Sequence, residues 1–165
     1  MNSTPKRTNY IKSNDENIEY ELSNFVFRNN NISCLSLSKD MEKIAVGKDF
    51  PQARIYSTST RDEICSFEFD NDTHVTLVSF SHDSNQLSVL LYYQNDDDES
   101  VCDAKAIVFD LITKRALQVF QLPDYLPSSM AFSKDGKMLA IGSEDGMVII
   151  YVIKNRKQVQ FFDQF

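Results

Sequence analysis

Three stretches of the chain share one pattern, in which alternating apolar residues precede Ser-x-Asp and a second apolar run follows three residues later. The serines of the three copies are Ser38, Ser81 and Ser133. Alternating apolar residues are typical of a half-buried strand, and Ser and Asp favour turns because their short side chains hydrogen-bond the nearby backbone. Each copy therefore predicts a β-hairpin with Ser-x-Asp at its turn.

The residues that follow each hairpin repeat as well. Every copy continues with a β-branched and aromatic run, a short polar turn and a fourth run, which are features of strands. The third strands are predicted at 53–56, 106–109 and 147–151, and the fourth at 64–69, 117–122 and 158–161. One copy is therefore a four-stranded unit, and no stretch shows the apolar stripe and caps expected of a helix.

The spacing of the copies predicts the architecture. The anchor serines recur after 43 and 52 residues, close to the repeat length of a four-stranded propeller blade, and the longer second spacing reflects the loop between Tyr93 and Asp103. We therefore expect an all-β fold of four-stranded antiparallel blades of β-propeller type. The predicted domain spans 18–165, with blades at about 32–69, 75–122 and 127–162.

One more strand is expected before the first blade. Residues Leu22–Phe27 align with Ile64–Phe69, the fourth strand of the first copy, so the prediction is three blades plus one extra N-terminal strand. Propellers close with about 4 to 8 blades, so we expect the ring to be incomplete in this chain. Three explanations are ranked in order: further blades of a longer protein, completion by self-association or a partner, and a smaller sandwich-like fold.

The turns differ in their glycine content. Gly136 follows the Asp of the third copy and supplies the positive φ that a tight hairpin favours. Met41 and Ser84 hold that place in the other copies, so those two turns are expected to be looser or strained.

The third copy resembles the WD-repeat propeller family. The similarity rests on three short runs, Phe132-Ser-Lys-Asp-Gly136, Leu139-Ala-Ile-Gly-Ser143 and Asp145-Gly146, and on the strand ending at Tyr151. Over residues 22–162 the strand spacing agrees with this family. The resemblance implies a rigid blade scaffold that binds other proteins through its loops and rims.

The chain departs from the family's most frequent signatures. Phe109-Asp110 is the one close variant of the Trp-Asp dipeptide, and the opening Gly-His dipeptide is missing, so the His/Asp tetrad of such repeats is not available. The first copy, with Ala45-Val-Gly47, Pro51 and Ala53-Arg-Ile-Tyr56, is similar to blades of large ciliary WD-repeat proteins.

Charge and cysteine content limit the class of partner and the compartment. The net charge of −7 argues against direct nucleic-acid binding, because an acidic surface repels phosphates. Cys34, Cys65 and Cys102 form no C-x-x-C pair and favour a reducing, intracellular and most simply cytoplasmic location, with nuclear and ciliary locations left open. Polar residues 1–17 predict a disordered tail without a signal peptide, and no apolar stretch is long enough for a membrane helix.

Residues suited to catalysis or metal binding are sparse. His74 and His82 are the two histidines, and both are expected at the surface. Ser81-His82-Asp83 has the residue types of a triad, but adjacent side chains on a turn point apart. Asp40, Asp83 and Asp135 hold equivalent repeat positions, which marks them as turn formers. We therefore predict no enzyme activity, no catalytic or metal site and no cofactor.

One loop is a candidate for binding. The second copy carries an acidic insertion, which we read first as a solvated loop and second as a dock for a basic partner. Its residues are Asp96, Asp97, Asp98 and Glu99. Calcium is disfavoured because the loop lacks the alternating ligands and turn glycine of an EF-hand.

Taken together, these features predict a non-catalytic protein–protein interaction scaffold that is a subunit or fragment of a larger complex. The expected partners are other proteins, with neither nucleic acid nor membrane contacted directly. Three alternatives stay open: an architectural subunit of a ciliary or axonemal assembly, a scaffold for ribonucleoprotein assembly, and an enzyme or ligand-binding propeller that uses its central channel.

Overall fold

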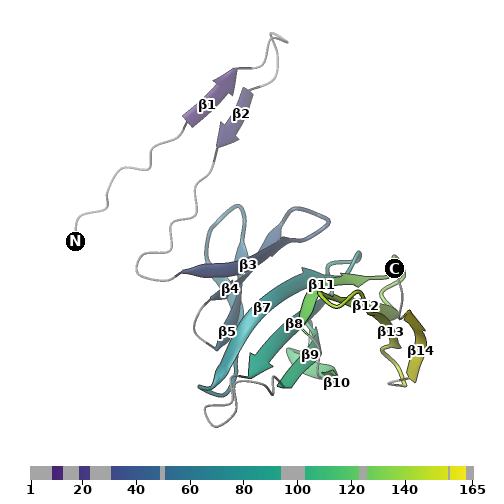
Figure 1. Cartoon of the computed structure of the whole chain (residues 1–165). Coiled ribbons are helices and arrows are strands. Elements are labelled where there is room, and N and C mark those ends of the chain that lie inside the picture. The colour runs from purple at the N-terminus through teal and green to yellow at the C-terminus, as the bar shows by residue number, and fades with distance from the viewer. Residues whose placement is uncertain are drawn as a thin grey trace.

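The strands of the chain form four antiparallel sheets, three of which have four strands each (Figure 1). The computed structural model describes residues 9–12, 19–22, 31–48, 51–93, 103–122, 126–155 and 157–162. Within these residues there is no helix, and hence none that is long and apolar enough to cross a bilayer.

Each four-stranded sheet is a meander, since neighbouring strands follow one another along the chain. Blade 1 consists of β3 (Ile32–Leu37), β4 (Lys43–Lys48), β5 (Gln52–Ser57) and β6 (Glu63–Glu68). Blade 2 consists of β7 (Thr73–Phe80), β8 (Gln86–Tyr93), β9 (Asp103–Asp110) and β10 (Arg115–Leu122). Blade 3 consists of β11 (Pro127–Phe132), β12 (Met138–Ser143), β13 (Val148–Val152) and β14 (Lys157–Phe162). The predicted all-β fold of four-stranded antiparallel blades is confirmed.

The fourth sheet is a pair of short strands near the N-terminus. β1 (Asn9–Lys12) pairs with β2 (Glu19–Leu22) and lies apart from the blades in Figure 1. β1 falls inside the segment 1–17, where composition predicts a disordered tail, and that tail stays a prediction. The extra strand predicted at Leu22–Phe27 lies outside the described residues except for Leu22, which ends β2.

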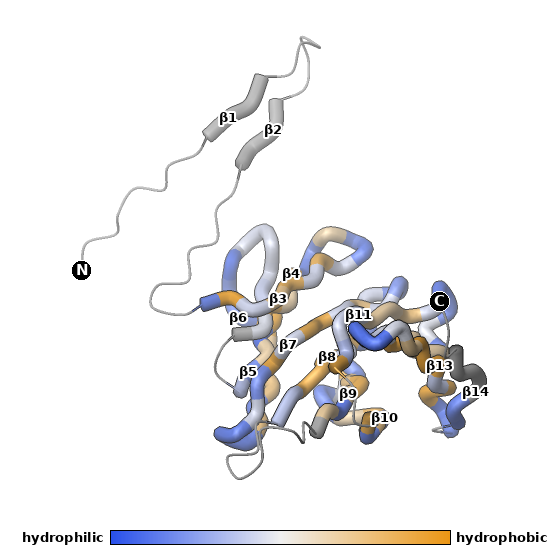
Figure 2. Tube along the Cα trace, in the orientation of Figure 1, coloured by the Kyte–Doolittle hydropathy of each residue, from blue (hydrophilic) through white to orange (hydrophobic). Residues whose placement is uncertain are grey.

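Strand β8 of blade 2 is buried on both faces, which explains its nearly continuous apolar sequence. On β8, Leu87, Val89 and Leu91 pack against blade 1, and Leu90 packs against blade 3. Figure 2 shows the hydrophobic residues concentrated along β7, β8 and β13. Because side chains alternate along a strand, one strand supplies two separate cores.

The first strands of the three blades lie side by side. β7 contacts β3 on one side and β11 on the other, so the blades succeed one another around a common axis. The described blades form an open arc and do not close a ring (Figure 1). One face of blade 1 and one face of blade 3 are consequently not covered by a neighbouring blade.

Removing a side chain from the double-sided strand should destabilise the fold strongly. Leu90 is fully buried, so Leu90→Ala should lower the free energy of unfolding by about 2–5 kcal/mol through lost burial and a new cavity. Ile112, which is 75% exposed, is the control, and Ile112→Ala should change stability by less than about 0.5 kcal/mol. Equilibrium denaturation measures the stability of both variants. Equal losses of stability would contradict the assignment of β8 as a strand buried on both faces.

Candidate functional site

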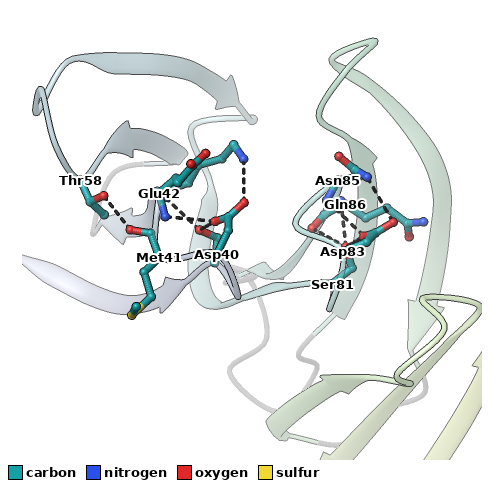
Figure 3. Close-up of polar contacts among 10 residues, drawn as sticks. Asp40, Met41, Glu42, Thr58, Ser81, Asp83, Asn85 and Gln86 are labelled. Atoms are coloured by element: carbon teal, nitrogen blue, oxygen red, sulfur yellow. Dashed lines mark hydrogen bonds and ion pairs between the residues drawn. The ribbon is translucent and has the colours of Figure 1, made fainter.

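The three Ser-x-Asp turns are built on the same set of hydrogen bonds. In the second copy, the Ser81 hydroxyl donates to Asp83 Oδ1 at 2.6 Å and accepts the Gln86 N–H at 2.9 Å (Figure 3). Asp83 Oδ1 also accepts the Asn85 N–H at 3.1 Å. Serine and aspartate thus satisfy the backbone donors of the reversal, as expected of short polar side chains.

The first and third copies repeat this geometry. The serine hydroxyl donates to the aspartate at 2.5 Å in the Ser38–Asp40 pair and at 2.7 Å in the Ser133–Asp135 pair. Each aspartate also accepts the next available backbone N–H, from Glu42 and Lys137 at 3.0 and 3.1 Å respectively. The prediction that these three aspartates are turn formers is therefore confirmed.

The backbone of the turns decides between the two alternatives expected for Met41 and Ser84. Met41 and Ser84 both have a φ of 59°, close to the 68° of Gly136 at the equivalent place. The sequence predicts that these two turns are looser or strained. They are not looser, because the Ser–Asp hydrogen bonds impose one conformation on all three copies, and their positive φ agrees with the strained alternative. Met41 and Ser84 instead take a left-handed conformation that is unfavourable for residues with a Cβ.

Hydrogen bonding also changes the acidity of the turn carboxyls. The Ser38 hydroxyl, followed by the Glu42 N–H, lowers the pKa of Asp40 to about 2. The Ser81 hydroxyl lowers the pKa of Asp83, and the Ser133 hydroxyl lowers that of Asp135. Donors that favour the charged carboxylate explain all three shifts.

The residues that sequence singles out for chemistry do not converge. His74 lies on β7, whereas His82 lies in the second Ser-x-Asp turn. The Ser81 hydroxyl donates to Asp83, so the turn itself uses the serine and aspartate of the Ser81-His82-Asp83 run. Among the described residues, no group of three or more His, Cys, Asp or Glu side chains could hold a metal ion. The acidic loop residues Asp96, Asp97, Asp98 and Glu99 lie outside the described residues, so that dock stays a prediction.

A cavity of about 550 Å³ lies where the three first strands run into their turns. Its wall contains Lys39, His82 and Lys134, the middle residues of the three Ser-x-Asp turns. Its remaining lining comes from the ends of the same strands and includes Leu37, Phe80 and Phe132. Sequence analysis did not identify this set. One feature of the sequence could have indicated this set: the middle position of Ser-x-Asp carries Lys, His and Lys in the three copies, whereas the flanking Ser and Asp are explained by the turn.

The uncovered face of blade 1 is apolar along its first strand. Leu35 and Leu37 are 60% and 50% exposed, whereas the equivalent Val78 and Phe80 of blade 2 are 7% and 8% exposed. The same repeat positions are therefore buried in blade 2, which packs against blade 1, and exposed in blade 1, while Met130 and Phe132 of blade 3 are partly buried. Farther out on this face, Arg54 hydrogen-bonds Gln52 and pairs with Glu63 at 3.2 Å.

A protein-family model matches part of the chain. A model described as "WD domain, G-beta repeat" matches residues 118–151. The matched segment begins within β10 of blade 2 and ends within β13 of blade 3. The sequence repeat is thus offset by one strand from the structural blade, so that it links neighbouring blades.

A curated protein and several solved WD40 structures are similar to this chain. SEC12-like protein 1 from Arabidopsis thaliana is 28% identical over 123 residues, which cover 74% of this chain and 30% of that relative. The structure of the RRP9 WD40 repeats superposes with a TM-score of 0.68 at 16% identity, covering 84% of this chain and 40% of the other. The C-terminal WD40 domain of Sif2 gives 0.63 at 17% identity, covering 81% and 37%. The three sheets therefore have the fold of propeller blades, residues 118–151 match the WD repeat, and the chain spans less than half the length of these proteins.

The positive φ of Met41 predicts a stabilising substitution. Met41→Gly should raise the free energy of unfolding by about 0.5–1 kcal/mol, because relief of left-handed strain exceeds the added chain entropy. Gly136→Ala is the matched reverse change and should lower stability by about 1 kcal/mol. A Cβ there would have 3.7 Å of space to Gln86 Nε2, so the effect comes from the backbone. Denaturant unfolding measures the free energy of unfolding of both variants. A Met41→Gly variant less stable than the wild type would contradict the claim that Met41 is strained.

The lowered pKa of Asp40 predicts a loss of stability in acid. Its folded pKa of about 2 lies below the ordinary 3.8, so its contribution is present above about pH 4 and is lost as pH falls through about 2. Asp40→Asn should make the free energy of unfolding less dependent on pH across this window. Ser38→Ala, which removes the main donor, should flatten the same limb of the curve. An unchanged pH dependence in both variants would contradict the proposed role of the hydrogen bond.

Proposed function

We propose that this chain of WD40-type blades is a non-catalytic scaffold that binds other proteins within a larger complex. The observation that carries the proposal is the apolar strand β3 on the uncovered face of blade 1. Leu35 and Leu37 are exposed there, although their equivalents in blade 2 belong to a core. An exposed apolar patch on a rigid sheet is typical of a surface that another protein covers.

The turns support the same role. Their serine and aspartate side chains are engaged in holding the backbone, which leaves a rigid framework from which loops and faces are presented. The similarity to SEC12-like protein 1 covers 30% of that protein, so what the whole relative does is not carried over to this chain. Ciliary and ribonucleoprotein assemblies remain alternative settings for a scaffold, and an intracellular location remains part of the proposal.

Affinity purification with a matched pair of face variants tests the scaffold. Leu35→Asp places a charge on the uncovered face of blade 1 and should reduce recovery of specific partner proteins by about tenfold, the effect expected of an interface anchor. Ile112→Asp adds the same charge at a position that is 75% exposed in the β9–β10 turn, and it should leave recovery unchanged.

The composition of the purified set distinguishes the alternatives. Axonemal proteins would favour the ciliary setting, and ribonucleoprotein subunits would favour the other. The scaffold proposal fails if the wild-type chain retains no partner and instead turns over a metabolite. It also fails if Leu35→Asp and Ile112→Asp retain the same proteins to the same extent, since the uncovered face would then have no part in binding.

A further inference from the structure

The cavity where β3, β7 and β11 run into their turns combines cationic and apolar residues from all three blades. Lys39, His82 and Lys134 contribute the cationic or titratable side chains, and each of these residues is exposed. Leu37, Phe80 and Phe132, also at equivalent repeat positions, contribute an apolar floor. Repetition therefore places three copies of the same two-residue arrangement around one opening of about 550 Å³.

The lysines of this opening are not neutralised by the adjacent turn carboxylates. Asp40 pairs with Lys43 at 3.5 Å, and Asp135 pairs with Lys137 at 3.8 Å. Among the ion pairs of the described residues, none includes Lys39 or Lys134. Each turn carboxylate is also held by its serine hydroxyl and a backbone N–H, so it is committed to the turn.

We propose that this cavity binds a short acidic peptide segment of a partner protein. Carboxylates of the peptide pair with Lys39 and Lys134 and accept a hydrogen bond from His82, while an apolar side chain of the peptide rests on Leu37 and Phe132. The proposal rests on the protein-binding function above and specifies a second surface for it. That surface shares Leu37 with the uncovered face around Leu35, and it differs from that face in Lys39, His82, Phe132 and Lys134.

The charge distribution favours a short peptide over a nucleic acid. The chain carries a net charge of −7, and Asp40, Asp83 and Asp135 lie one residue beyond the three cavity residues. A long polyanion would extend beyond the cavity and be repelled by the acidic surface around it. The few carboxylates of a short peptide can instead lie entirely within the cavity. The apolar floor also offers burial to a leucine or phenylalanine side chain, which a phosphodiester backbone does not supply.

The test is a fluorescence anisotropy titration of the full chain with the labelled peptide Glu-Glu-Phe-Glu-Glu at low salt. The double variant Lys39→Gln/Lys134→Gln should bind at least about tenfold more weakly than the wild type, with a shallower salt dependence. Lys137→Gln is the matched control, because it removes a charge from the same turn region outside the cavity, and it should change affinity by less than about twofold. Thermal unfolding of each variant checks that the fold is retained.

Several outcomes would overturn the proposal. The proposal is overturned if the wild-type chain does not bind the peptide. It is also overturned if Lys137→Gln weakens binding as much as the double variant does, because equal losses would indicate general charge attraction. A single-stranded oligonucleotide of equal charge that binds more tightly than the peptide would assign the cavity to nucleic acid instead. If the peptide titration fails while Leu35→Asp still reduces partner recovery, the scaffold function stands. The titration tests the cavity lysines on purified protein, whereas Leu35 is not part of the cavity lining.

Discussion

Face-to-face packing between consecutive blades is the constraint on which the rest of the structure depends. A single four-stranded blade has two apolar faces and cannot bury either alone, so its stability depends on its neighbours. Aromatic pairs join the blades at both contacts of blade 2. Phe67 stacks on Phe109 with ring centroids 4.0 Å apart, and Phe120 lies 4.6 Å from Tyr151. Gly47 shows how close blades 1 and 2 approach, because a Cβ there would meet Cys34 Sγ and lie 2.6 Å from Val75 Cγ1.

The turns show how side-chain hydrogen bonds override local backbone preference. A residue with a Cβ disfavours positive φ, yet Met41 and Ser84 adopt the conformation of Gly136. The serine and aspartate before them satisfy backbone donors that would otherwise be lost at the reversal, and this gain exceeds the strain. The turn conformation is therefore specified by the serine and aspartate side chains. Glycine at the positive-φ position lowers the backbone strain but is not required for the turn to form.

The sequence predicts the strand order well because strand burial leaves a periodic signal. Alternation around Ser38, Ser81 and Ser133 is sufficient to predict the hairpins, and the recurring β-branched runs predict the third strands of the blades. The cavity could not be predicted in the same way, since Lys39 and Lys134 are separated along the chain and become neighbours only through blade packing. The contrast between Leu35 and Val78 also depends on packing, because both residues have the same place in the repeat and differ only in whether a blade precedes them.

A repeat of this kind separates positions that make the fold from positions that remain available for recognition. In Ser-x-Asp the outer two residues are engaged by the turn, and the leucines and valines of β8 are engaged by the two cores. The middle residue is exposed in all three copies, and none of the side-chain hydrogen bonds of the described turns involves it. Lys and His at that position are therefore not required by the hydrogen bonds of the turn. In a chain with a net charge of −7, their recurrence around one cavity is better explained by what the cavity contacts.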